Sequence, residues 1–309
     1  MHTHHNTKHQ HHQYMIMIHV FLMVLFLAIG SQSSAPYSRV AIDFGSIQIY
    51  WYAIFILTGV VIAAYYSQNE LNRLNYPKDI IYDGLLIGLP LALLGARLYY
   101  VLFDPIPHYK TFLDIMNISK GGLAIHGAII TTLVFVPIFC KIKKIKLLPL
   151  IDTLMIGFLI GQIVGRFGNF MNHEAYGPAI QSAWVIDILP KFIVEQMTLG
   201  SVVHHPTFLY EGLWNLSMLV TLIILKKKRL LKVGENLGLY LIWYGLGRGI
   251  IIEPMRVNGA YGDALMIMDI PVNIIMSLVF VALGVVYLFF SRLKMKNLPY
   301  QVDLVNVTS

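Results

Sequence analysis

The segment 150–177 reads LIDTLMIGFLIGQIVGRFGNFMNHEAYG, and it decides the fold class of the chain. Residues 150–170 form an apolar run close to the roughly 20 residues that an α-helix needs to cross a bilayer core. Within it, Gly157, Gly161 and Gly165 recur every four residues, a stripe that allows a second helix to pack closely. A polar cluster follows from Arg166 onward. The segment therefore predicts a membrane-spanning helix with polar groups at one end.

The composition of the whole chain is typical of a polytopic membrane protein. Of its 309 residues, 57% are hydrophobic and 13% are charged, and the mean hydropathy is +0.65. Apolar runs of similar length occur at 46–66, 80–103, 123–140, 150–170, 208–225, 237–253 and 268–290. We therefore expect an all-α fold in which residues 46–296 form seven core transmembrane helices. Residues 297–309 would form a cytoplasmic tail.

The first 45 residues form a separate, histidine-rich extension. Its apolar run, 15–30, ends at the small residues 31–35, which is typical of a signal peptide, although Lys8 is the only basic residue before it. The run is equally consistent with an eighth, uncleaved helix. Both alternatives deliver the next helix from the outside. The histidines favour an expression tag or an extended start over a metal site.

Basic residues gather in alternate loops between the predicted helices, which sets an orientation. By the positive-inside rule, the first core helix begins outside and the C-terminus lies in the cytoplasm. Because the formal net charge of +7 is distributed by loop, we do not expect nucleic-acid binding. The basic residues of these loops are Arg73, Lys78, Lys141, Lys143, Lys144, Lys146, Lys226, Lys227, Lys228, Arg229, Lys232, Arg292, Lys294 and Lys296.

Four arginines lie inside or next to the predicted spans, namely Arg97, Arg166, Arg248 and Arg256. A cation at membrane depth costs at least about 2.5–3.5 kcal/mol on insertion scales, so each arginine needs a compensating partner. A guanidinium binds phosphate through a bidentate fork, whereas an ammonium acts as a point charge. The choice of arginine therefore predicts a phosphate-bearing ligand that lives in the membrane, which means a phospholipid.

The predicted orientation places polar residues from several helices at the same depth. Tyr52 and His126 lie near the outer ends of inward-running helices, and the four arginines lie toward the outer ends of outward-running ones. Arg166 and Asn169 are three residues apart and share a helix face. We therefore expect one site that faces the outer leaflet and the extracytoplasmic space.

The sequence lacks the signatures of several other classes of protein. A single cysteine, Cys140, excludes an internal disulfide. The sequence has no Gly-x-Ser-x-Gly, no paired metal-ligand spacing and no nucleotide-binding glycine loop, so we expect no metal and no cofactor. A transporter would spread its charges through the midplane and show repeat symmetry. An intramembrane protease would need a serine nucleophile or a pair of aspartates at depth.

Three motifs, in their order and spacing, resemble the prolipoprotein diacylglyceryl transferase family. They are GGLAIHG at 121–127, GRFGNFMNHE at 165–174 and HPTFLYE at 205–211. The resemblance covers roughly residues 37–296 and implies a seven-helix enzyme of the bacterial inner membrane. Such an enzyme moves the diacylglyceryl group of phosphatidylglycerol to the lipobox cysteine of a prolipoprotein and releases glycerol-1-phosphate. The alternatives are another phosphatidylglycerol-using transferase and, less favoured, a lipid transporter.

The resemblance also implies roles for individual residues. His126 is the candidate base for the cysteine thiol, and Arg166 with Arg248 is the candidate phosphate clamp. Tyr52 joins them as a catalytic candidate. Glu174 is either an alternative base or a salt-bridge partner of Arg166. The residues expected to bind phosphatidylglycerol are Arg166, Asn169, Glu174, Gly177, Tyr244, Arg248, Glu253 and Arg256.

One spacing departs from the family pattern. The family usually has the glutamate four residues after the arginine of the sixth helix, whereas Glu253 follows Arg248 by five. On a regular α-helix one extra residue turns the later side chains by about 100°. We expect Gly249 or Pro254 to absorb the extra residue in a bulge or kink.

Overall fold

The computed structural model describes residues 2–30, 36–104, 109, 111–117, 121–257, 266–267, 270–294 and 296–304. Within these ranges, the side chains of 2–14, 251, 256–257 and 266–267 are not described. The chain forms two compact units, each of which is described here by itself. The larger unit contains Met1–Ser67 and Ile151–Val307, and the smaller unit contains Gln68–Leu150.

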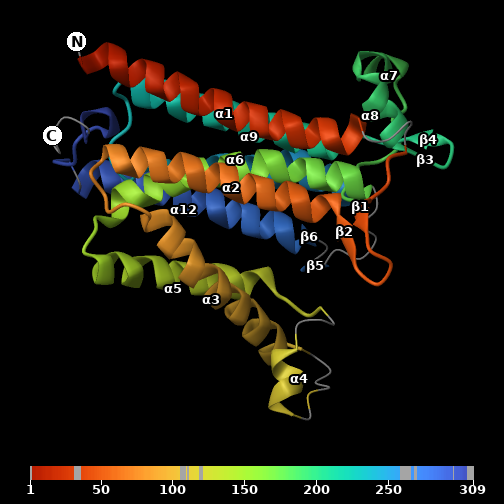
Figure 1. Cartoon of the computed structure of the whole chain (residues 1–309), viewed down its shortest axis with the longest axis horizontal. Coiled ribbons are helices and arrows are strands. Elements are labelled where there is room, and N and C mark those ends of the chain that lie inside the picture. The colour runs from red at the N-terminus through yellow and green to blue at the C-terminus, as the bar shows by residue number, and fades with distance from the viewer. Residues whose placement is uncertain are drawn as a thin grey trace. The chain divides into compact units, whose positions relative to one another are not determined.

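The described part of the chain is mainly helical, with short hairpins at the ends of helices (Figure 1). Three antiparallel hairpins pair β1 (Val40–Asp43) with β2 (Gln48–Tyr50), β3 (Thr198–Leu199) with β4 (Val202–Val203), and β5 (Met266–Ile267) with β6 (Ile270–Pro271). The helical segments are α1 (His2–Gly30), α2 (Trp51–Arg73), α3 (Ile80–Leu102), α4 (Phe112–Met116), α5 (Ile125–Lys143), α6 (Leu147–Asn172), α7 (Ala183–Ile188), α8 (Lys191–Gln196), α9 (Thr207–Lys227), α10 (Glu235–Leu246), η1 (Gly247–Ile252), α11 (Glu253–Val257), α12 (Val272–Lys294) and η2 (Gln301–Asp303).

Six helices of the described residues are long and apolar enough to cross a membrane, whereas the sequence predicts seven. These six are α2, α3, α5, α6, α9 and α12. The expected seventh helix, 237–253, is divided into α10, the π-helix η1 and α11. Because its hydrogen-bonding pattern changes within the run, no single α-helix of spanning length forms there.

The glycine stripe of α6 packs against α2, which confirms the close approach predicted from the sequence. A Cβ atom added to Gly59 of α2 would lie 3.0 Å from the carbonyl oxygen of Gly161, and one on Gly157 would lie 2.8 Å from Ser67 Oγ. A Cβ atom at Gly165 would meet open space. Gly157 and Gly161 therefore let two spanning helices of the larger unit approach almost to backbone contact.

The apolar run of the N-terminal extension is a helix that packs onto the core of the larger unit. Met17, Phe21, Val24 and Ala28 follow a helical stripe in or against this core, and Ala28 is fully buried. The ring of Phe21 meets the edge of Phe167 on α6, with 5.0 Å between centroids. The small residues 31–35 lie outside the described residues, so both alternatives for the extension remain predictions.

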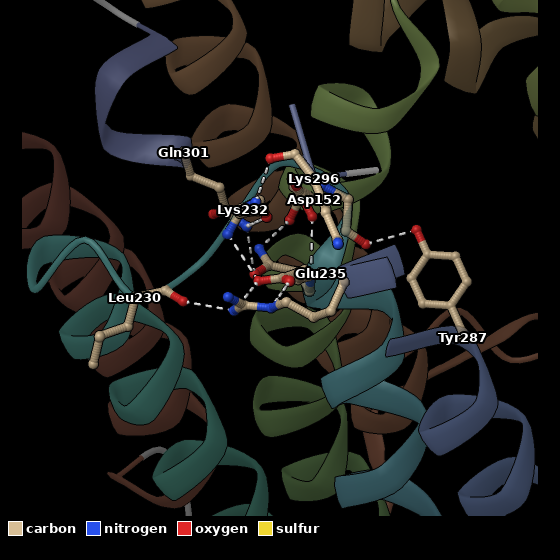
Figure 2. A network of polar contacts seen from close by, with 10 residues as sticks. Asp152, Leu230, Lys232, Glu235, Tyr287, Lys296 and Gln301 are labelled. Atoms are coloured by element: carbon tan, nitrogen blue, oxygen red, sulfur yellow. Dashed lines mark hydrogen bonds and ion pairs between the residues drawn. The ribbon is translucent and has the colours of Figure 1, made fainter. Parts of the chain in front are cut away.

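A polar network near the start of α6 joins α10, α12 and the C-terminal segment (Figure 2). Asp152 accepts hydrogen bonds from the backbone N–H groups of Gly234 at 2.6 Å and Asn236 at 3.0 Å. It thereby caps the beginning of α10 from another helix. Glu235 accepts a hydrogen bond from Arg292 at 2.8 Å, so the last spanning helix is tied to the same end.

The segment expected to be a cytoplasmic tail is docked on this network as far as residue 304. Gln301 is buried and donates to the Lys232 carbonyl at 3.1 Å and to Asn236 Oδ1 at 3.0 Å. Its backbone N–H bonds to the Leu231 carbonyl at 2.9 Å. The polar groups of this segment therefore replace water at the loop between α9 and α10.

Replacement of Asp152 by Ala should destabilise the protein, because the N–H groups of Gly234 and Asn236 would stay buried without acceptors. Each orphaned group costs about 1–3 kcal/mol. We expect a lower Tm in detergent for Asp152→Ala than for the wild type, and an unchanged Tm for Asp187→Ala, whose side chain is exposed. Equal Tm values for the two variants would contradict the capping role.

Candidate active site

Two of the arginines predicted to bind phosphate share one carboxylate at the far end of α6 from Asp152. Arg166 on α6 forms an ion pair with Glu211 on α9. Arg248 on η1 pairs with the other oxygen of the same carboxylate at 3.2 Å. Both arginine side chains are 19% exposed and that of Glu211 is 7% exposed. The two guanidinium groups are therefore brought together by a buried anion and remain partly accessible.

Glu253 supplies the second carboxylate of this cluster despite its five-residue spacing from Arg248. Its Oε2 lies 3.1 Å from Arg248 Nη2, and its Oε1 accepts from Asn273 of α12 at 2.8 Å. The intervening residues form the π-helix η1, whose wider turn places residues i and i+5 on the same face. The sequence predicts that Gly249 or Pro254 absorbs the extra residue in a bulge or kink, and the structure has a π-helix that contains Gly249.

Glycines allow η1 to lie close to its neighbours. A Cβ atom at Gly247 would clash with the Trp214 ring of α9, and one at Gly249 would lie 2.6 Å from Ser277 Cβ of α12. Trp214 in turn donates to the Trp243 carbonyl at 3.0 Å, and Trp243 donates to the Trp214 carbonyl at 3.1 Å. These reciprocal bonds fix α9 against α10 just before Arg248.

Asn169 and Glu174 extend the cluster beyond the end of α6. Arg166 donates to Asn169 Oδ1 at 3.3 Å, and Asn169 donates to Glu174 Oε1 at 2.9 Å. The chain reverses here through His173 and Ala175, which have left-handed backbone angles, φ 53° and 57°. Glu174 therefore reaches Arg166 through Asn169, whereas a direct salt bridge to Arg166 is one of the two roles that the sequence suggests for it.

Tyr52, Gly177 and Tyr244 lie at three different positions in the larger unit. The ring of Tyr52 lies over Gly168, where an added Cβ atom would come within 2.9 Å of it. Gly177 is buried and its N–H bonds to the His205 carbonyl at 2.9 Å. Tyr244 stacks on Tyr240 with 5.8 Å between ring centroids.

His126 lies in the smaller unit, at the beginning of α5, and its side chain is exposed. Its ring stacks on Tyr99 of α3, with 5.8 Å between centroids and 29° between planes. An exposed imidazole fits a base that must receive a proton from an incoming substrate. It also means that the ring needs neighbours to fix its direction.

The other two membrane arginines are Arg97 and Arg256. Arg97 is in the smaller unit, where its guanidinium donates to the backbone carbonyls of Asp114, Ile115, Gly121 and Gly122. These carbonyls compensate its buried charge without a phosphate, which changes the expectation for Arg97. Arg256 belongs to α11, but its side chain lies outside the described residues.

Glu211 is the residue of this site to which the sequence assigned no role. It closes the HPTFLYE motif at 205–211, but the motif alone does not say which cation it meets. A usable signal was present, because a carboxylate inside a predicted span also needs a partner. With several arginines predicted at the same depth, pairing could not be derived from spacing.

Deletion of Ile250 should convert the π-turn of η1 into a regular α-helical turn. Arg248 and Glu253 would then be four residues apart and still share a face. We expect the variant to retain most of its Tm and activity. Val220, which is also exposed but lies in the regular helix α9, provides the matched control, because its deletion rotates the following residues by about 100°. Equal damage from both deletions would contradict the π-turn explanation.

The sequence is similar to proteins of one family over most of its length. A family model described as prolipoprotein diacylglyceryl transferase matches residues 39–290. A phosphatidylglycerol–prolipoprotein diacylglyceryl transferase of Streptococcus uberis is 38% identical over 262 residues, which cover 84% of this chain and 97% of that protein. The proteins of the same name from Streptococcus sanguinis and Bacillus cereus are 40% and 38% identical over 265 and 255 residues, covering 84% and 82% of this chain and 97% and 92% of their own lengths. The chain therefore belongs to the prolipoprotein diacylglyceryl transferase family.

Proposed function

We propose that this multi-pass membrane protein transfers the diacylglyceryl group of phosphatidylglycerol to the thiol of the lipobox cysteine of a prolipoprotein. The observation that carries the proposal is the pair of guanidinium groups, Arg166 and Arg248, held on Glu211 within a bundle of apolar helices. Relatives with this activity in their names match most of the chain. Phosphatidylglycerol offers a phosphodiester to such a pair.

The reaction forms one bond and breaks one bond at a glycerol carbon of the lipid. The cysteine sulfur attacks the carbon that carries the phosphate, so a C–S bond replaces the C–O bond. Glycerol-1-phosphate leaves with the electron pair of the broken bond, and the thiol proton passes to a base. Because the thiolate is the nucleophile and a free cysteine has a pKa of about 8.5, a base and a stabilised leaving group are both needed.

The charges of the cluster determine how a phosphate would bind. Arg166 and Arg248 balance in formal charge the two carboxylates with which they form ion pairs, Glu211 and Glu253. A phosphodiester adds one negative charge, so it binds best where Glu211 shares the guanidinium donors with it. Each guanidinium has five N–H donors in a planar fork, which allows one arginine to serve a carboxylate and a phosphate together. Charge that develops on the leaving phosphate is then stabilised where water is scarce.

The remaining site residues have supporting roles in this proposal. His126 takes the thiol proton, since histidine is the side chain that most often serves as a general base. Tyr52, Asn169, Glu174 and Tyr244 orient the lipid or the thiol. Glu253 holds Arg248, which makes it a positioning residue. Gly177 and Arg256 complete the predicted lipid-binding set.

The lysine-rich loops support an orientation for the enzyme in the bacterial inner membrane. The segments 141–146 and 226–232 would face the cytoplasm, together with residues 297–309. Arg166, near the opposite end of α6 from Asp152, would then face the outer leaflet, where translocated prolipoproteins arrive. This orientation gives the lipid and the peptide access to the same side.

A transfer assay tests the function directly. Membranes that carry this protein are supplied with phosphatidylglycerol labelled in its acyl chains and a lipobox peptide, or with the same peptide in which serine replaces cysteine. We expect label on the cysteine peptide only, because serine oxygen is a much poorer nucleophile at neutral pH. Label on both peptides, or on neither, would contradict thioether formation.

Replacement of Arg166 by Lys should abolish most of the activity. Lysine keeps the charge but loses the fork that serves Glu211 and phosphate together, and loss of one donor to a developing anion costs about 10²–10³-fold in rate. Arg292→Lys is the control, since Arg292 also pairs with a buried glutamate but at the other end of the larger unit. Near-normal turnover of Arg166→Lys in the labelled-lipid assay would remove Arg166 from the clamp.

A further inference from the structure

The guanidinium group of Arg97 donates hydrogen bonds to the loop that leads to His126. Its side chain is almost completely buried, with 5% of the residue exposed. Nε donates to the Ile115 carbonyl at 2.6 Å and Nη2 to the Asp114 carbonyl at 2.9 Å. Nη1 donates to the carbonyls of Gly121 and Gly122 at 3.1 and 3.0 Å. One side chain therefore joins the end of α4 to the two residues that begin the motif containing His126.

The neighbours of Arg97 on α3 hold the next part of the same motif. The backbone N–H of Ala124 bonds to the Ala96 carbonyl at 3.0 Å. A Cβ atom at Gly127 would clash with the carbonyl of Gly95, so the absence of a side chain at Gly127 lets α3 and α5 approach closely there. Two residues beyond Arg97, Tyr99 stacks on His126 itself.

Two glycines make the Arg97 contacts available. Gly121 and Gly122 have φ angles of 84° and 76°, in the left-handed region that other residues rarely adopt. This backbone directs both carbonyls to the same nitrogen of Arg97. A Cβ atom at Gly122 would clash with that nitrogen and would lie 2.8 Å from the Tyr100 ring. A change at either side of the contact would therefore displace the loop.

We infer that Arg97 is a positioning residue for the proton-accepting imidazole of His126. This inference rests on the proposed function, in which His126 takes the proton of the cysteine thiol. The ring is exposed at the beginning of α5, so its position depends on the loop before it and on Tyr99. Arg97 binds the two carbonyls that begin that loop and two carbonyls at the end of α4. Displacement of a catalytic group by about 1 Å can reduce a rate by about 10²-fold.

A positioning role for Arg97 differs from phosphate binding and from a purely structural role in the property of the enzyme that a substitution changes. A phosphate-binding arginine would change the affinity for phosphatidylglycerol. A residue that only stabilises the fold would lower the Tm and the amount of active enzyme, whatever base is present. A residue that acts through His126 affects the rate only while His126 is there.

A double-mutant cycle in the labelled-lipid assay tests this. His126→Asn should reduce turnover by roughly 10²–10⁴-fold, and higher pH should partly restore it, because more of the substrate is then thiolate. Arg97→Lys should reduce turnover by at least about tenfold, since an ammonium cannot reach the same four carbonyls, with the same partial recovery at high pH. In the His126→Asn background, Arg97→Lys should change turnover by less than about twofold.

Gly122→Ala provides a second variant in case Arg97→Lys fails to insert or fold. It disrupts the same contact from the loop side. It should give the same pH-dependent loss of turnover, again only while His126 is present. Gly45→Ala is the matched control, because Gly45 has φ 82° but open space around its Cβ position. It should show backbone strain in Tm without the pH-dependent loss of activity.

The outcomes distinguish this inference from the proposed function. Equal losses from Arg97→Lys in both backgrounds, a weakened affinity for phosphatidylglycerol, or near-native turnover of His126→Asn would each overturn the positioning role. If the wild-type enzyme transfers label to the cysteine peptide while the cycle is additive, only the inference fails. If the wild-type enzyme transfers no label, the proposed function fails.

Discussion

The ion pairs of Glu211 with Arg166 and Arg248 are the interaction on which the candidate site depends. They join α6, α9 and η1, three segments that are far apart in the sequence. A buried ion pair is a weak source of stability, but removal of one partner leaves an uncompensated charge that costs about 3–5 kcal/mol. The carboxylate therefore fixes where two cations lie, and it does so on α9 opposite α6, two helices long and apolar enough to cross a membrane. Every other polar contact of the cluster extends from these two arginines.

The features that could be predicted from the sequence depend on repeated local patterns. Six of the seven apolar runs are helices of spanning length, because length and hydropathy are sufficient to identify them. The four-residue glycine stripe of α6 also predicted a close helix contact, which Gly157 and Gly161 make with α2. The motif around Arg166 predicted a polar cluster, and Asn169 lies where a three-residue spacing on a helix requires.

The features that were missed depend on contacts between distant segments. Nothing in the spacing of α3 shows that Arg97 meets backbone carbonyls instead of a ligand, because backbone acceptors leave no pattern in the sequence. The two glycines before His126 contain part of that information, since consecutive glycines permit the left-handed backbone that directs both of their carbonyls to Arg97 here. The docking of Gln301 could not be predicted for a similar reason. Its partners, Lys232 and Asn236, are 69 and 65 residues away in the sequence.

The π-helix η1 has a consequence for how related membrane enzymes are compared. A wider turn allows the chain to gain one residue inside a helix while the side chains on both sides keep their partners. The number of residues between two side chains and the angle between them around the helix axis can thus vary independently. Two sequences can differ in length within the same helix and still present the same charges to the same neighbours. A motif defined by fixed intervals would misplace Glu253, whereas one defined by which side chains form a pair would find it.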